Sequence, residues 1–194
     1  FRQRFEGGQQ VEAPEDWLNQ PHPWEFVRVD YSYEIGFKGH VETVDGRTVW
    51  HPGESVIARA YDTPVVGWKG RWANTLRLWG AQPTNLFDLH RFNSGDHAEA
   101  AKPEALARTL SRVLYPDDTT DSGKELRLKQ EYFLTAAALQ DILRRYMDEH
   151  GDDLTGLPDT VAIQLNDTHP AIAGPELIRL LMDQHGYGFP EALK

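Results

Sequence analysis

Residues 161–181 constrain the fold more than any other stretch of the chain. Residues 161–165 (Val-Ala-Ile-Gln-Leu) are a short, mainly apolar run, which is typical of a buried parallel strand. Apolar side chains then recur at helical spacing from Leu177 to Met182. Between the two lies the polar sequence Asn-Asp-Thr-His-Pro at 166–170, which we call the 166–170 loop. In open α/β sheets, ligands bind beyond the carboxyl ends of the strands, so the pattern predicts an α/β unit with a candidate site in this loop.

A purely structural interpretation of the same loop is equally simple. Asp167 or Thr168 would cap the following helix, and Pro170 would open it. Periodicity alone favours this interpretation, because such caps are common.

The composition excludes several classes of protein. The 194 residues include no cysteine, which excludes a disulfide framework and thiolate metal sites, and the histidines show no metal-ligand spacing. A formal net charge of −10 argues against nucleic acid as a partner. No apolar run is long enough to span a bilayer. The chain opens at Phe1, and residues 189–194 look like the start of a helix, so we interpret both ends as cuts through a longer chain.

The first part of the chain, residues 1–82, is expected to be rich in β-structure. Apolar and polar residues alternate from Tyr31 to Lys38, as in a strand with one buried face. Residues 40–44 and 47–50 flank Asp45-Gly46, a strong signal for a two-residue hairpin. Further strands are expected at 55–60 and 75–79. Five of the six tryptophans lie between Trp24 and Trp79, and packing in the core is favoured over stacking on sugars.

Residues 96–194 are expected to be α/β, after a linker at 82–101. A helix is predicted at 103–114, with Pro103 in its first turn and an apolar stripe of Leu106, Leu110 and Val113. A longer helix is predicted at 124–147, with one face formed by Leu128, Tyr132, Thr135, Leu139, Ile142 and Tyr146. Residues 148–158 are expected to form turns. The pattern indicates one partial domain over residues 1–194.

Ordered motifs along the chain resemble those of the glycogen (α-glucan) phosphorylase family. They are Trp-Leu at 17–18, Pro-Trp-Glu at 23–25, Tyr-Asp-Thr-Pro at 61–64, Asn-Thr-Leu-Arg-Leu-Trp at 74–79, Arg-Val-Leu-Tyr-Pro at 112–116, Gly-Lys-Glu-Leu-Arg-Leu-Lys-Gln-Glu-Tyr-Phe at 123–133 and the 166–170 loop. Long, non-degenerate motifs in the same order are more specific than a short glycine-rich pattern.

The resemblance implies the middle of the N-terminal domain of a two-domain enzyme of GT-B type. Its activity would be the release of glucose 1-phosphate from the non-reducing end of an α-1,4-glucan, with inorganic phosphate as the acceptor. The cofactor implied is pyridoxal 5′-phosphate, with its lysine and most phosphate ligands outside these residues. The resemblance also implies a cytoplasmic homodimer in which the helix at 96–112 contacts the partner.

The resemblance also implies which residues contact the sugar. Asp118 matches an acidic residue in a mobile gate beside the catalytic site, and Asp167 and His169 match residues lining the glucosyl pocket. Asp117 stands where the family usually has asparagine. Thr119 and the threonine after it replace residues that in the animal enzymes include aromatics stacking purine-like inhibitors, so we do not expect such inhibition. Without the resemblance, Asp117 and Asp118 could equally belong to a solvated turn.

Three arginines have two interpretations. Arg144 and Arg145 lie near the end of the predicted long helix, where cations complement the helix dipole. The resemblance to muscle-type enzymes implies instead that they and Arg77 grip the phosphate of a nucleotide effector, for which the guanidinium fork is suited.

Two other functions stay open at this point. One is a hydrolase that uses Asp117 or Asp118 with Asp167 as acid and base, although glycosidase chemistry requires a defined separation of the carboxylates. The other is a glucan-binding module built on the tryptophan-rich β region. The preferred glucan, the full chain length and any regulation do not follow from these residues.

Overall fold

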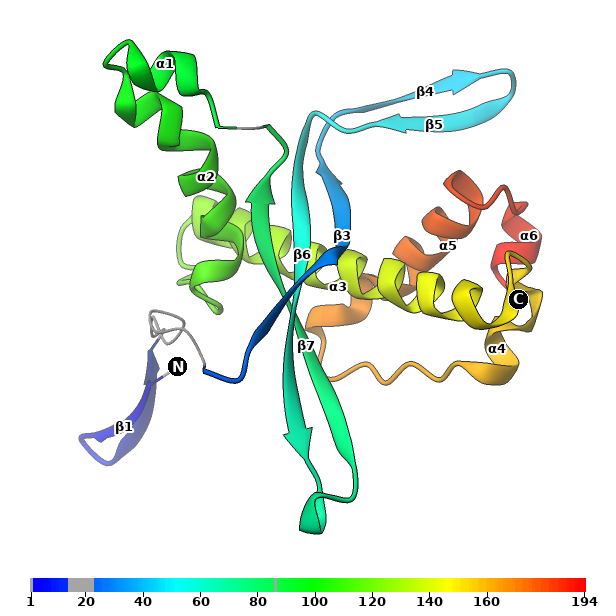
Figure 1. The fold of residues 1–194 in the computed structure, drawn as a ribbon, viewed down its shortest axis with the longest axis horizontal. Helices are drawn as coiled ribbons and strands as arrows, with labels where there is room; N and C mark the ends of the chain where they lie inside the picture. Colours follow the sequence, from blue (N-terminus) through cyan, green and yellow to red (C-terminus); the bar gives the residue numbers. More distant parts are fainter. Residues whose placement is uncertain (1, 14–22, 86) are drawn as a thin grey trace. The chain divides into compact units, whose positions relative to one another are not determined.

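The computed structural model describes residues 2–13, 23–85 and 87–194, a mixed α/β chain in which the strands precede the helices (Figure 1). Trp17 and Leu18 of the motif series lie outside the described residues. The chain divides into two compact units, here called the first unit (Phe1–Phe37 and Glu54–Gln130) and the second unit (Lys38–Gly53 and Glu131–Lys194).

The first unit is built on a three-stranded antiparallel sheet with β6 in the centre (Figure 1). Its strands are β3 (Phe26–Phe37), β6 (Glu54–Val66) and β7 (Ala73–Pro83), and a separate hairpin pairs β1 (Arg2–Glu6) with β2 (Gln9–Ala13). The alternation predicted from Tyr31 onward is confirmed, because Ile35 and Phe37 are buried and Ser32 and Glu34 are exposed. The strands expected at 55–60 and 75–79 are also confirmed, although both are longer than expected.

Two helices complete the first unit, α1 (Leu89–Asn93) and α2 (His97–Arg112), which packs against β7. The Ser111 hydroxyl of α2 accepts a hydrogen bond from the backbone N–H of Ala81, at 3.1 Å. The core of this unit combines small and large apolar residues from the sheet and α2: Ile35, Phe37, Ala58, Ala60, Trp79, Ala81, Ala100, Ala107 and Leu110.

The prediction for α2 was wrong in its start and in its buried stripe. The helix begins six residues before Pro103, because residues 97–102 include three alanines, a glutamate and a lysine, all strong helix formers. Pro103 therefore lies inside the helix, and the expected linker at 82–101 contains helical residues. Leu106 is 60% exposed, whereas Leu110 is buried with Ala100 and Ala107.

Core packing was also a wrong expectation for most of the tryptophans. Trp79 is buried, but Trp24, Trp68 and Trp72 are largely exposed, with Trp68 86% exposed. Trp68 and Trp72 lie in or beside the connection between β6 and β7. The indole N–H of Trp72 is nevertheless satisfied by the side-chain oxygen of Asn74, at 2.9 Å.

The second unit contains the predicted hairpin. Strands β4 (His40–Val44) and β5 (Arg47–His51) pair in the expected register, and the turn residues Asp45 and Gly46 both have positive φ (50° and 78°). Positive φ at both central residues is the requirement of a type I′ turn, which favours Asp-Gly.

The longest helix, α3 (Asp121–His150), includes residues of both units. It confirms the predicted long helix, and it confirms the predicted face in part. Thr135, Leu139 and Tyr146 of that face are buried, whereas Leu128 is 58% exposed. Buried side chains outside the predicted face are Phe133, Ala136, Ala137 and Leu143.

The remaining regular elements of the second unit are helices and 3-10 turns. It comprises the 3-10 turn η3 (Leu154–Gly156), α4 (Leu157–Thr160), the 3-10 turn η4 (His169–Ile172), α5 (Ala173–Asp183) and α6 (Phe189–Ala192). Its apolar core is formed by Leu139, Leu143, Tyr146, Leu154, Leu157, Ala173, Leu180 and Leu181. The predicted helix after the 166–170 loop is therefore confirmed as α5.

The strand predicted at residues 161–165 is not formed. These residues have no regular secondary structure, and all but Val161 are exposed. A strand needs a hydrogen-bonded neighbour, and the strands that the structure describes in the second unit, β4 and β5, pair with each other.

Candidate functional site

Residues 116–123, here called the acidic segment, form a turn stabilised by their own polar side chains. The Asp117 carboxylate accepts a hydrogen bond from the backbone N–H of Thr119 at 2.9 Å, and this bond holds the pKa of Asp117 below its ordinary value. The Thr120 hydroxyl accepts from the N–H of Gly123 at 3.1 Å. A Cβ at Gly123 would lie 2.0 Å from the carbonyl oxygen of Asp117, so the close approach in this turn requires glycine.

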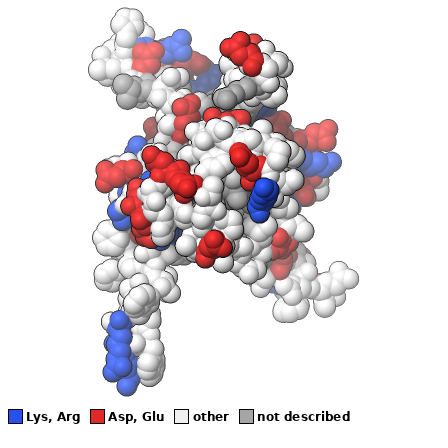
Figure 2. Space-filling view, turned by 90° about the vertical axis from the view of Figure 1, so that its right-hand side faces the viewer, with Lys and Arg blue, Asp and Glu red and all other residues white. Residues whose placement is uncertain are grey.

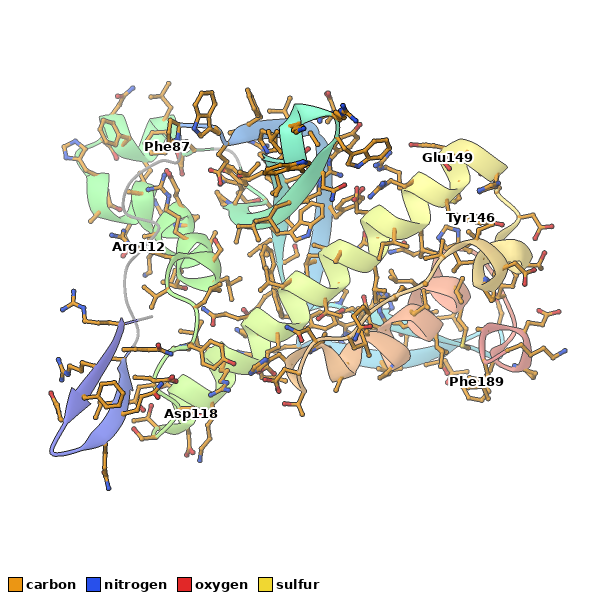
Figure 3. The ribbon with its side chains drawn as sticks, turned by 90° about the horizontal axis from the view of Figure 1, so that it is seen from below. Phe87, Arg112, Asp118, Tyr146, Glu149 and Phe189 are labelled. Atoms are coloured by element: carbon orange, nitrogen blue, oxygen red, sulfur yellow. The ribbon has the colours of Figure 1, made fainter. Side chains whose placement is uncertain are left out.

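The second aspartate of the segment is held by the helix that follows. Asp118 accepts a hydrogen bond from a guanidinium nitrogen of Arg127 at 2.8 Å, and the same guanidinium lies over the ring of Tyr115, 4.8 Å from its centroid. Figure 3 shows Asp118 at the turn that leads into α3. Sequence reasoning did not single out Arg127, although it lies in the motif at 123–133 and within two turns of the start of α3.

The 166–170 loop is exposed and internally hydrogen-bonded. Asp167 has a positive φ of 67°. Its carboxylate accepts from the backbone N–H of Thr168 at 2.6 Å and from the Thr168 hydroxyl at 3.2 Å. Thr168 precedes η4 without a side-chain cap bond, whereas Pro170 lies in the first positions of η4, as the structural interpretation predicts. His169 is half-buried.

The predicted sugar-contacting residues thus form two groups. Asp117, Asp118 and Thr119 belong to the first unit, and Asp167 and His169 belong to the second. Within each group the carboxylates accept hydrogen bonds from neighbouring N–H or guanidinium donors. Carboxylate oxygens can also accept hydrogen bonds from the hydroxyl groups of a sugar.

Arg77 is the centre of a network in the sheet. It lies opposite Asp62 in the register of β6 and β7, and its Nε and one terminal nitrogen each donate to that carboxylate at 2.7 Å. Arg28 donates to the same carboxylate at 3.2 Å, and both guanidinium groups lie 4.6 Å from the centroid of the Tyr31 ring. The Arg77 hydrogen bonds outweigh burial, so the pKa of Asp62 is lowered.

Arg144 and Arg145 lie on α3 in the second unit. Arg144 donates to Asp141 at 3.1 Å and also bonds to Asp148, one helical turn away on the other side. Arg145 is exposed. Arg144 and Arg77 are therefore each engaged with carboxylates in this structure.

Glu176 is, like Asp62 and Asp141, a buried carboxylate, and it lies in the second unit. Both oxygens of Glu176 accept hydrogen bonds from Arg179 at 2.8 Å, and the Tyr132 hydroxyl donates to one of them at 3.2 Å. Burial and the negative charge of Glu176 raise the pKa of Tyr132 to about 12. Burial lowers the pKa of Arg179, but the bonds and charge of Glu176 outweigh it and raise that pKa above its ordinary value.

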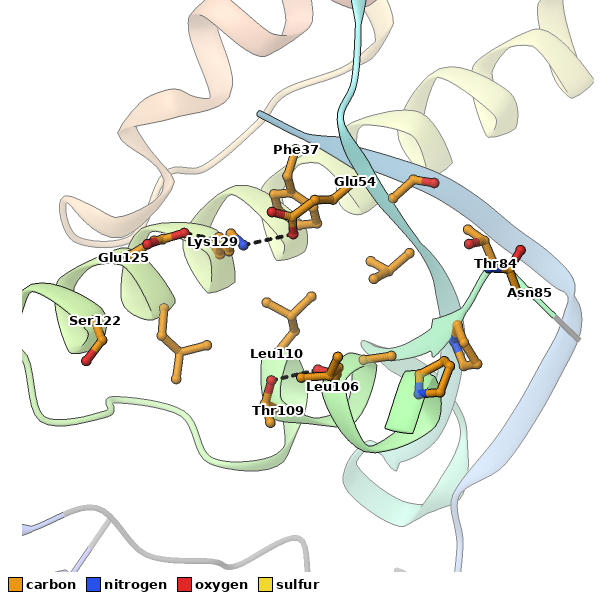
Figure 4. Close-up of a pocket in the computed structure, with 16 residues that line it drawn as sticks. Phe37, Glu54, Thr84, Asn85, Leu106, Thr109, Leu110, Ser122, Glu125 and Lys129 are labelled. Carbon is orange, nitrogen blue, oxygen red and sulfur yellow. Dashed lines mark hydrogen bonds and ion pairs between the residues drawn. The ribbon is translucent and has the colours of Figure 1, made fainter. Parts of the chain in front are cut away.

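The first unit also contains an open cavity of about 440 Å³ between the sheet, α2 and the start of α3 (Figure 4). At one side the Lys129 ammonium lies 3.1 Å from Glu54 and 3.5 Å from Glu125, over the ring of Phe37. None of the predicted sugar-contacting residues lines this cavity.

The surface and side-chain chemistry limit what other groups could bind. Most of the charged side chains visible in Figure 2 are acidic. Across residues 2–13, 23–85 and 87–194, no three histidine, aspartate or glutamate side chains are grouped so as to hold a metal ion. In the same ranges no helix is long and apolar enough to cross a membrane.

Comparison with known proteins identifies the family. The model of the carbohydrate phosphorylase family matches residues 1–194. The chain is 48% identical over 192 residues to the glycogen phosphorylase of Haemophilus influenzae, covering 99% of this chain and 23% of that protein. It is 48% identical to the α-glucan phosphorylase H isozyme of Triticum aestivum (99% and 24% covered) and 46% identical to the muscle glycogen phosphorylase of Homo sapiens (94% and 23% covered). The chain therefore spans about a quarter of the length of these relatives, and it belongs to the carbohydrate phosphorylase family.

Proposed function

We propose that these residues are part of an α-glucan phosphorylase, which transfers a glucosyl unit from the non-reducing end of an α-1,4-glucan to inorganic phosphate and releases glucose 1-phosphate. The observation that carries this proposal is the match of the family to all 194 residues, together with 46–48% identity to relatives named glycogen or α-glucan phosphorylase. The same proposal includes a GT-B architecture for the complete protein, with residues 1–194 as one part of its N-terminal domain, and a cytoplasmic location.

Within that enzyme, we assign this chain a wall of the sugar-binding cleft. Asp117, Asp118 and Thr119 would contact the sugar from the acidic segment, and Asp167 and His169 would contact it from the 166–170 loop. The carboxylates of the aspartates support this role, because carboxylate oxygens accept hydrogen bonds both in the structure and from sugar hydroxyls. No catalytic residue is assigned to this chain.

The pyridoxal 5′-phosphate of the family does not fit the lysines of this chain. Attachment as a Schiff base requires a lysine that can lose its proton in an enclosed pocket. Lys129 is paired with the carboxylates of Glu54 and Glu125, and the other lysines, at positions 38, 69, 102, 124 and 194, are exposed. We therefore propose that the cofactor lysine lies elsewhere in the complete protein. Borohydride reduction and mass mapping should find no cofactor on residues 1–194; a modified lysine among them would refute this.

The activity is tested by product analysis in the complete protein. With an α-1,4-glucan and increasing phosphate, we expect glucose 1-phosphate to form at a rate that saturates with phosphate. When arsenate replaces phosphate as the acceptor, the product should be glucose, because the glucosyl arsenate ester is unstable and hydrolyses. Release of glucose at the same rate without phosphate would instead identify a hydrolase, and glucan binding without turnover would identify a binding module.

We also propose that α2 takes part in a homodimer. Leu106 supports this, because it is a large apolar residue that is 60% exposed on α2, whereas its helix neighbours Ala107 and Leu110 are buried in the first unit. In the complete protein, Leu106→Glu should favour monomers in light scattering. Leu128→Glu is the matched control, since Leu128 is 58% exposed on α3. If Leu106→Glu leaves the protein dimeric, or if Leu128→Glu produces the same fraction of monomers, the interface does not lie at Leu106.

We also propose a nucleotide-effector site at Arg77, Arg144 and Arg145. It would require Arg77 and Arg144 to exchange their carboxylate partners for phosphate. Calorimetric titration of the complete protein with adenosine monophosphate tests it. Binding that is lost in Arg145→Ala would support the site, and an unchanged titration would refute it.

A further inference from the structure

Glu176 is a buried carboxylate whose bonded partners lie on α5 and α3 of the second unit. Its side chain is 3% exposed, and it bonds to Arg179 on its own helix and to Tyr132 on α3. Arg179 in turn lies over the ring of Trp50 on β5, 5.2 Å from the centroid. The indole N–H of Trp50 donates to the carbonyl of Lys38 at 2.7 Å. One carboxylate therefore links α5 to α3 and, through Arg179, to the β4–β5 hairpin.

This linkage lies close to the 166–170 loop along the chain. Glu176 is in the first turn of α5, and α5 follows η4 without a break. The turn of η4 is closed by the hydrogen bond from Ala171 N–H to the carbonyl of Thr168, at 3.0 Å. A shift of the first turn of α5 along or around its axis would therefore be passed to Thr168 and Asp167 through η4, a short 3-10 turn with a kink at Pro170 (φ −86°, ψ 16°).

The chemistry makes Glu176 an effective anchor. A buried carboxylate that loses a hydrogen-bond donor pays a desolvation cost, so α5 is most stable in the position where Arg179 and Tyr132 both reach Glu176. The bonds between Arg179 and Glu176 lie within α5, so they cannot fix the position of α5 relative to α3. Among the bonds described for Glu176, the Tyr132 hydroxyl is the one that comes from another helix.

We propose that Tyr132 and Glu176 are positioning residues that hold the 166–170 loop in the geometry that binds the glucosyl group. The proposal rests on the function proposed above, and neither residue is assigned a contact with substrate. Misplacement of a binding loop by about 1 Å can lower a reaction rate by about two orders of magnitude, so a single lost bond at this point has a measurable effect.

The test is Tyr132→Phe in the complete protein, which removes the hydroxyl and keeps the ring. We expect the KM for glucose 1-phosphate in glucan synthesis to rise about tenfold, an effect of about 1.4 kcal/mol. The matched control is Tyr187→Phe. The Tyr187 hydroxyl also lies in the second unit and accepts from the N–H of Leu154 at 2.8 Å, but it does not contact α5 through Glu176. We expect a similar change in Tm for the two variants but a change in KM only for Tyr132→Phe.

A second measurement does not depend on activity. Amide hydrogen exchange at residues 168–173 should become faster in Tyr132→Phe than in Tyr187→Phe. Exchange in this segment that is equal in the two tyrosine variants would overturn the positioning role, even in an active enzyme. If exchange becomes faster in Tyr132→Phe but its KM for glucose 1-phosphate stays at the wild-type value, the link between this loop position and sugar binding would be overturned. A wild-type protein that forms no glucose 1-phosphate would refute the proposed function, whereas the exchange result would still decide whether Tyr132 positions the loop.

Discussion

Asp62 in the sheet and Glu176 in the helical unit are both buried carboxylates bound by two donors of an arginine, at 6% and 3% exposure. They differ in where the donors come from. Asp62 is bonded by arginines 15 and 34 residues away, on β7 and β3. Glu176 is bonded by Arg179, three residues along the same helix, and has one partner hydroxyl on α3.

The comparison shows that similar bidentate pairs can serve different purposes. The Asp62 network joins all three strands of the sheet, so it stabilises the tertiary structure of the first unit. The Glu176–Arg179 pair would form in an isolated helix, so its contribution to tertiary structure depends on Tyr132 and on the contact between Arg179 and Trp50. We therefore expect loss of Asp62 to affect stability most, and loss of the Glu176 contacts to affect the neighbouring loop.

The largest effect is expected for Asp62→Asn. The change leaves Arg28 and Arg77 without their shared anion, and removing one partner of a buried pair costs roughly 3–5 kcal/mol. The urea midpoint of the complete protein should fall accordingly. Asp30→Asn is the control, because Asp30 is exposed on β3. A similar small effect of both changes would contradict the structural role of the Asp62 network.

Glu176→Gln should destabilise less than Asp62→Asn. Glutamine keeps an acceptor oxygen for Tyr132, and Arg179 retains Asp183 at 3.3 Å. We expect a cost of about 1–3 kcal/mol, typical of a weakened buried hydrogen bond to a charged group. The same urea experiment measures it, and a cost equal to or larger than that of Asp62→Asn would reverse the ranking of the two networks.

A smaller and more specific difference is expected in acid. The pKa of Asp62 is lowered by Arg77, so its contribution to stability is complete above the ordinary carboxyl value of 3.8 and is lost as the pH falls through the lower folded-state value. The stability difference between wild type and Asp62→Asn should therefore narrow below pH 3.8. A difference that is constant from pH 6 to pH 3, measured by urea titration at each pH, would show that ionisation of Asp62 is not what stabilises the sheet.

The sequence predicted the elements whose determinants are local. Asp45-Gly46 specifies its hairpin because both residues accept positive φ, and the alternation from Tyr31 onward follows from one buried sheet face. The prediction of a strand at 161–165 was wrong, because a strand needs a hydrogen-bonded neighbour, and the residues of the strand do not specify that neighbour. The start of α2 was predicted at Pro103, because proline is common in the first turn of a helix. The helix begins earlier, at His97, because the residues before Pro103 are strong helix formers.

The candidate site was predictable only in part, for the same reason. The residues of the acidic segment and of the 166–170 loop were identified from motifs, but their partners were not. Asp62 and Arg77 face each other only once the register of β6 and β7 is known, and Tyr132 reaches Glu176 from 44 residues away. Contacts of this separation have no periodic signal in the sequence.

The central claim is that this chain supplies residues that contact the sugar, and Asp118→Ala in the complete protein tests it most directly. Its bond to Arg127 is at the surface, so we expect a stability change of no more than about 1 kcal/mol. Steady-state kinetics in both directions should show a lower kcat and a higher KM for glucose 1-phosphate, with kcat/KM reduced about tenfold or more. Asp121→Ala, which removes a fully exposed carboxylate at the start of α3, should leave both constants unchanged. Wild-type kcat and KM in Asp118→Ala would contradict the claim.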